Sequence, residues 1–210
     1  MNQTTTKQSK NQRVNVNKIC FTAMFGALAG ALMFIKFPLP FFPTFFDMDF
    51  AAIPEIIGAY MFGPVSGICI VFIKMAIKIL FSGTQSFGAG EIQNIILSLV
   101  YILPTSIIYK YNKSKDVAVI TLAIDTVLVT IAAIFSNIYF IFPYFANMMG
   151  CSFDDLIAMC AAINPAIKNT FTLAAFAIAP FNLIKYGVSS ILTILVYKRL
   201  SIAIKKITYN

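Results

Sequence analysis

The chain has 210 residues, of which 59% are hydrophobic and only 11% are charged, and its mean hydropathy is +0.83. So few polar residues cannot coat a water-soluble domain, and the apolar residues come in blocks long enough to cross a lipid bilayer. The net charge of +8 lies mostly in short segments between or beyond these blocks, which is typical of a membrane protein and argues against a nucleic-acid partner.

Residues 1–17 are polar and contain no apolar run, which predicts a disordered cytoplasmic tail before a single membrane domain over residues 18–206. The first predicted membrane helix covers residues 18–37. Small residues recur along it at a spacing of four, namely Ala23, Ala27 and Ala31, and Gly26 and Gly30. Such a face lets another helix approach closely, either in this chain or in a separate subunit.

Segment 38–47 contains three prolines and four phenylalanines. The prolines prevent a helix, yet the segment is too apolar for a solvated linker. It is predicted to be a rigid hydrophobic lid; the alternative is an aromatic loop at the membrane interface.

Five more helices are predicted after this segment. They cover residues 50–62, which is too short to cross a bilayer upright, then 65–81, 91–109, 117–142, broken at Pro143, and 169–197, kinked at Pro180. An interfacial helix is predicted over 153–163. The fold class is therefore all-α and integral to the membrane, with six transmembrane helices. Basic residues gather at both termini and in the 110–116 loop, which places both termini in the cytoplasm.

Two polar residues lie deep in the last apolar block. Asn182 and Lys185 are three residues apart, so on a helix they share one face. A lysine at that depth needs a partner, and either a ligand or a carboxylate such as Asp125 or Glu91 would serve. Earlier in the chain, Lys74 is expected to pair with Glu55. Lys78 is expected to extend towards the membrane interface.

The predicted topology places further polar groups on the outer side. Asn94 and Asn137 lie near outer helix ends, and the glycine-rich loop 82–90 joins two helices there. With Asn182 and Lys185 they can line an outward-facing pocket. Carboxamides and an ammonium suit the carbonyl and imide edges of a flat heteroaromatic ligand, whose faces the aromatic side chains would cover. Interhelical hydrogen bonding is the alternative role for these polar groups.

The sequence lacks the usual equipment of an enzyme. It contains no histidine, no nucleophile motif and no nucleotide-binding glycine loop, and its four cysteines do not have a metal-ligand spacing. We therefore expect no catalytic residues, no metal site and no cofactor.

Several motifs, taken in order, resemble the riboflavin-binding S-components of energy-coupling factor (ECF) transporters. The similar segments are Phe37 to Phe45, Asp49 to Pro54, Phe62 to Gly67, Ser82 to Glu91, Asn164-Pro165 and Pro180 to Lys185. The resemblance implies a multi-pass protein of the cell membrane that binds riboflavin from the outside. It also implies two kinds of partner, a transmembrane coupling subunit and two ATPase subunits that hydrolyse ATP.

The resemblance also assigns roles to residues. It implies that Asn137, Asn182 and Lys185 bond the isoalloxazine ring, and that the pocket is completed by first-loop residues around Thr44, with Phe45, and by the glycine loop near Gly83 and Thr84. The expected topology adds Asn94 to this substrate-binding set. Ala23, Ala27 and Ala31 match the helix face that docks the coupling subunit in this family. The alternatives are an S-component for another vitamin, such as thiamin or biotin, a membrane enzyme acting on lipids, for which catalytic groups are missing, and a structural membrane protein without a ligand.

Overall fold

The computed structural model describes residues 3–40, 42–43, 46–84 and 86–209 of the chain. The described elements, in order, are α1 (Gln3–Met33), β1 (Phe37–Pro38), β2 (Asp47–Met48), α2 (Ala52–Phe62), α3 (Pro64–Ser82), α4 (Ala89–Tyr111), α5 (Lys115–Ser136), the π-helical turn η1 (Asn137–Ile141), α6 (Phe142–Met149), α7 (Phe153–Ile163), α8 (Thr170–Leu173), the π-helical turn η2 (Ala174–Ile178) and α9 (Ala179–Tyr209). The prediction of a helical protein is confirmed; the two short strands form one antiparallel pair.

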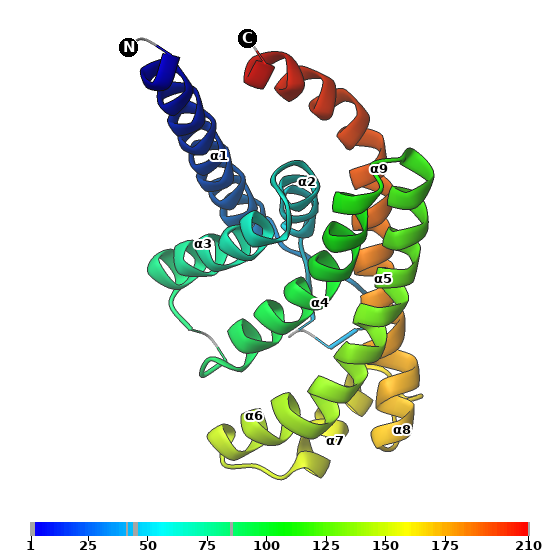
Figure 1. The fold of residues 1–210 in the computed structure, drawn as a ribbon. Helices are drawn as coiled ribbons and strands as arrows, with labels where there is room; N and C mark the ends of the chain where they lie inside the picture. Colours follow the sequence, from blue (N-terminus) through cyan, green and yellow to red (C-terminus); the bar gives the residue numbers. More distant parts are fainter. Residues whose placement is uncertain (1–2, 41, 44–45, 85, 210) are drawn as a thin grey trace.

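Five helical segments in the described part of the chain are long and apolar enough to cross a membrane. They are Val16–Met33, Pro64–Ser82, Ala89–Tyr111, Lys115–Met149 and Thr170–Tyr197. The apolar helix α2 has only 11 residues, so the count of six membrane crossings stays a prediction. In Figure 1, α1 begins and α9 ends at one end of the molecule, and α6, α7 and α8 lie at the opposite end.

Helix α1 differs from the predicted helix at both ends. Its helical backbone begins at Gln3, inside the segment predicted as a disordered tail, and the division into tail and membrane domain stays a prediction. It ends at Met33, four residues earlier than predicted. Phe37 precedes a proline, which disfavours the helical conformation, and it pairs with Met48 in the two-stranded ladder instead.

The small residues of α1 divide between two faces. Gly26 and Gly30 are buried against α3, where a Cβ atom would lie 2.6 Å from Cγ2 of Ile73 and 2.9 Å from Cγ2 of Ile77. Ala23, Ala27 and Ala31 are exposed. The glycines therefore allow close packing inside this chain, and the alanines leave a smooth face uncovered.

The prediction that Pro143 breaks a helix is wrong. Helix α5 continues through η1 into α6, and Pro143 lies in the first turn of α6. A π-helical turn adds a residue to one turn of the helix, which lets the chain accommodate a residue that lacks an N–H donor. The last helix contains a comparable turn, η2, which ends two residues before Pro180. The helix predicted over 153–163 is present as α7, capped by Ser152, and its place at the membrane interface stays a prediction.

The two ends of the aromatic segment 38–47 are held together by the antiparallel pairing of β1 with β2. Phe42 and Phe46 pack against Phe181 of α9, with ring centroids 5.7 Å and 4.9 Å apart. The segment therefore lies over the part of α9 that carries Asn182. Residues 41, 44 and 45 are outside the described residues.

Candidate functional site

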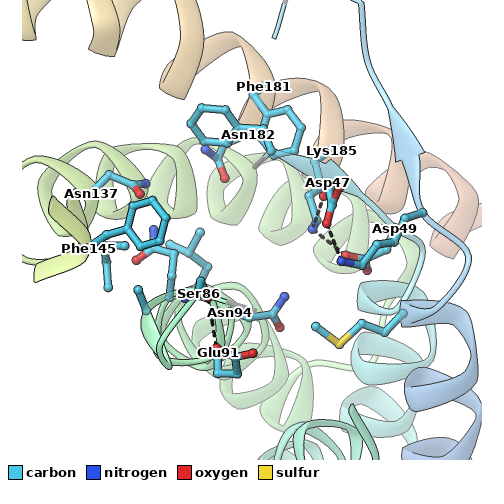
Figure 2. Close-up of a pocket in the computed structure, with 18 of the residues that line it drawn as sticks. Asp47, Asp49, Ser86, Glu91, Asn94, Asn137, Phe145, Phe181, Asn182 and Lys185 are labelled. Atoms are coloured by element: carbon cyan, nitrogen blue, oxygen red, sulfur yellow. Dashed lines mark hydrogen bonds and ion pairs between the residues drawn. The ribbon is translucent and has the colours of Figure 1, made fainter. Parts of the chain in front are cut away.

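A cavity of about 390 Å³ opens between the aromatic segment, α4, the η1–α6 turn and α9 (Figure 2). Its lining brings together four residues that the sequence analysis grouped from distant positions, namely Asn94, Asn137, Asn182 and Lys185. The volume falls within the range of small-molecule sites, which is about 300–1,000 Å³. The assignment of these four residues to substrate binding stays a prediction, but their convergence on one cavity is a feature of the fold.

The η1 turn and the start of α9 position two of the carboxamides. Nδ2 of Asn137 donates to the carbonyl oxygen of Ala133, and Nδ2 of Asn182 donates to that of Ile178, each at 2.8 Å. Only 3% of each asparagine is exposed. A carbonyl oxygen can only accept, so these contacts identify the nitrogen of each amide and leave its oxygen free to accept elsewhere.

Lys185 is held by the segment that precedes α2. Its Nζ donates to Oδ2 of Asp49 at 2.7 Å and to the backbone oxygen of Asp47 at 3.2 Å. The prediction that Asp125 or Glu91 is the carboxylate that pairs with Lys185 is therefore wrong. Asp49 lies 136 positions away in sequence, and only the folding of that segment over α9 brings the two together.

The surroundings of Asp49 favour its charged form. Burial would by itself raise the pKa of Asp49, but the positive charges of Lys185 and Lys74 and the hydrogen bonds from Lys185 and the Ala51 backbone together outweigh burial and hold that pKa below its usual value. Oδ1 of Asp49 also accepts from the backbone N–H of Ala51 at 2.9 Å. The carboxylate is thus fixed from both sides, and it fixes the ammonium in turn.

The other charges of the described lining are also paired. Lys78 forms an ion pair with Glu91 and donates to the carbonyl oxygen of Gly83 at 3.3 Å. Lys78 is only 9% exposed, so the expectation that it extends to the membrane interface is wrong. Lys36 pairs with Asp47 near the surface. Three lysines and three carboxylates balance one another in the described lining, which favours an uncharged ligand.

Aromatic side chains supply the apolar part of the cavity. The lining includes Phe46, Phe142, Phe145, Phe181 and Tyr186. Phe46 contacts both Phe181 and Phe142, at ring-centroid distances of 4.9 Å and 6.4 Å. Aromatic walls next to carboxamides suit a planar ligand with polar edges.

The glycine-rich loop contributes differently from the prediction. Gly83 and Thr84 are exposed and do not line the cavity; Ser86 and the first two residues of α4, Ala89 and Gly90, do. Gly83 has φ +64°, which suits its place at the C-terminal cap of α3. Thr44 and Phe45 fall outside the described residues.

Sequence reasoning did not single out Gln93. This residue lines the cavity, and both polar atoms of its side chain are buried without a protein hydrogen-bond partner in the described structure. A buried carboxamide without a partner is costly, so a ligand that bonds it would gain affinity. In the sequence, Gln93 could have been found as a second polar residue next to Asn94 in a largely apolar helix. No cluster that could hold a metal ion occurs among the described residues.

The comparisons with known proteins agree over most of the chain. Residues 17–197 match the family model described as "ECF transporter, substrate-specific component". The riboflavin transporter RibU of Staphylococcus aureus (strain TCH60) is 31% identical over 185 residues, covering 88% of this chain and 90% of the relative. The riboflavin transporter FmnP of Bacillus subtilis (strain 168) is 29% identical, covering 89% of this chain and 93% of the relative.

A solved structure has the same fold. It is described as "Structure and mechanism of the S component of a bacterial ECF transporter", and it superposes with a TM-score of 0.68 at 30% identity. The alignment covers 91% of this chain and 99% of that chain.

Proposed function

The chain belongs to the substrate-specific components of ECF transporters, and on this premise we propose that it captures riboflavin at the outer face of the cell membrane for ATP-driven uptake. The family and the matched relatives are transport proteins and not enzymes. The proposal concerns the ligand, the site and the partners of this chain.

The observation that carries the proposal is the chemistry of the cavity. Asn137 and Asn182 reach it from different helices, and the amide oxygen of each can accept a hydrogen bond from a ligand. Lys185 follows Asn182 by about one turn of α9. Riboflavin has a planar ring system with carbonyl and imide edges, and aromatic side chains cover flat faces well. The balanced charges of the described lining suit its uncharged ring and disfavour cationic thiamin.

The partners follow from the family. We propose that a transmembrane coupling subunit docks on the exposed alanines of α1, Ala23, Ala27 and Ala31, and that two ATPase subunits supply the energy. Both termini would be cytoplasmic, because basic residues gather near them in the sequence and in the α4–α5 connection, which lies towards the same end of the molecule in Figure 1. The cavity then opens to the cell exterior.

A fluorescence titration tests the proposed ligand. Purified protein is added to riboflavin, and we expect the flavin fluorescence to be quenched at micromolar ligand or below, because the rings of the cavity would stack near the isoalloxazine. Thiamin and biotin, added in excess, should not restore the fluorescence. The absence of quenching at micromolar riboflavin would reject the proposal.

A further inference from the structure

A buried ion pair stands behind the wall of the cavity. Glu55 of α2 and Lys74 of α3 form this pair, as the sequence predicted, and they are 0% and 1% exposed. Neither is among the residues that line the cavity. The desolvation of two buried charges can cost as much free energy as their mutual attraction returns. Such a pair is therefore not explained by its contribution to fold stability alone.

The ammonium of Lys74 also contacts α4. It donates to Oδ1 of Asn94 at 2.5 Å and to Oγ of Ser98 at 3.0 Å. Glu55 lies beside the same ammonium group as its ion-pair partner. Lys74 is not among the residues that line the cavity, so its contact with the cavity runs through Asn94.

This contact fixes which way the carboxamide of Asn94 faces. An ammonium group can only donate, so the atom that faces Lys74 is the oxygen. The hydroxyl of Ser98 approaches the same oxygen at 3.5 Å. The amide nitrogen of Asn94 is turned away from Lys74, and Figure 2 shows it on the side of the cavity that Asn182 and Lys185 reach from α9.

The three asparagines of the described lining thus differ in which atoms of their side chains stay available to a ligand. Asn137 and Asn182 give an N–H to their own helices and keep an oxygen to accept. Asn94 gives its oxygen to Lys74 and keeps two N–H donors. The cavity can therefore bond both a donor and an acceptor of one ligand, on different walls.

We propose that Lys74, held by Glu55, is a positioning residue that makes Asn94 a hydrogen-bond donor to the transported ligand. The group that Asn94 meets is an oxygen acceptor, either a ring carbonyl or a hydroxyl of the ribityl chain. This inference rests on the proposed function, because it takes the cavity to be the riboflavin site.

A double-mutant cycle tests the positioning role. The paired substitution Glu55→Gln with Lys74→Met removes both charges without leaving one of them buried alone. It should weaken riboflavin binding about tenfold or more, as should Asn94→Ala, because a buried hydrogen bond to the ligand is lost in each case. In the Asn94→Ala background the paired substitution should cause no further loss, since no amide remains to be oriented.

The control is Tyr109→Phe, which removes the hydrogen bond between the hydroxyl groups of Tyr109 and Tyr197 at the other end of α4. It should lower the melting temperature and leave riboflavin affinity unchanged in both backgrounds.

Losses that multiply when the paired substitution is combined with Asn94→Ala would overturn the positioning role, as would wild-type affinity in the protein that carries Glu55→Gln and Lys74→Met. In either case wild-type binding would keep the proposed function intact. A wild-type protein that does not quench riboflavin would overturn both.

Discussion

At the scale of single residues, the site depends on polar groups whose orientation is set by contacts inside the protein. Asn182 gives one N–H to its own helix, and Lys185 is held by Asp49 and the Asp47 backbone before any ligand arrives. Such contacts reduce the freedom that these side chains would lose on binding. A ligand therefore meets groups that are already in place, and removing Lys185 leaves the buried carboxylate of Asp49 without its cation.

We expect Asn182→Ala to weaken riboflavin binding by about 1–3 kcal/mol, because the ligand group that faces it would be buried without a partner. The same range applies to Lys185→Ala, where Asp49 is also left without its cation. Fluorescence titration measures both losses. Combining Lys185→Met with Asp49→Asn separates the two causes, because it removes the ligand contact and the stranded charge together. Wild-type affinity in both single variants would show that this face of α9 does not contact the ligand.

At the scale of elements, the two π-helical turns and the two faces of α1 matter most. η1 begins at Asn137, and η2 ends two residues before Pro180, shortly before Asn182. Each turn changes the register of its helix beside a carboxamide of the cavity, and π-helical turns occur often at functional sites. On α1, Gly26 and Gly30 pack against α3, and Ala23, Ala27 and Ala31 stay exposed.

The division of α1 into two faces predicts opposite effects for neighbouring substitutions. Ala27→Leu should leave riboflavin binding unchanged and abolish uptake in cells that contain the coupling and ATPase subunits, because the added side chain obstructs a close helix contact outside this chain. Normal uptake by this variant would contradict a docking role for the alanine face. Titration and a radiolabelled uptake assay measure the two effects.

Gly26→Leu is the matched control on the other face. Its side chain would collide with Ile73, where a Cβ atom alone lies 2.6 Å from Cγ2. We expect a destabilisation of about 1–3 kcal/mol, as is common when a close-packed site is overfilled. It should appear as a lower melting temperature of the purified protein, an effect that Ala27→Leu should not show.

At the scale of the whole molecule, buried ion pairs join elements around the cavity. Lys185 links α9 to the segment before α2, Lys74 links α3 to α2 and α4, and Lys78 links α3 to α4. The cavity is thus bounded by elements that are tied to one another by charge as well as by apolar packing. A ligand bound among them should stabilise the whole fold and not one helix alone.

Riboflavin should therefore raise the melting temperature of the purified protein. At a free concentration of 100 times the dissociation constant, the stabilisation expected from mass action is about 2.7 kcal/mol. Thiamin at the same concentration should have no effect, and Asn182→Ala should reduce the shift. A riboflavin concentration that saturates quenching but leaves the melting temperature unchanged would contradict binding inside this cavity.

The sequence by itself determined the membrane class, most helix positions and the absence of histidine chemistry, because apolar blocks of bilayer length and residue types are local properties of the chain. It also indicated the pairing of Lys74 with Glu55, and the convergence of Asn94, Asn137, Asn182 and Lys185 followed from the expected topology. Only the tertiary structure decided that Lys185 pairs with Asp49 and that Lys78 pairs with Glu91. The first pair requires the segment before α2 to fold over α9, 136 positions away in sequence, and the second requires α3 and α4 to bring these two side chains face to face across their connection. The orientation of each carboxamide was likewise decided by its neighbours in space, since an isolated asparagine can turn either its donor or its acceptor towards a ligand.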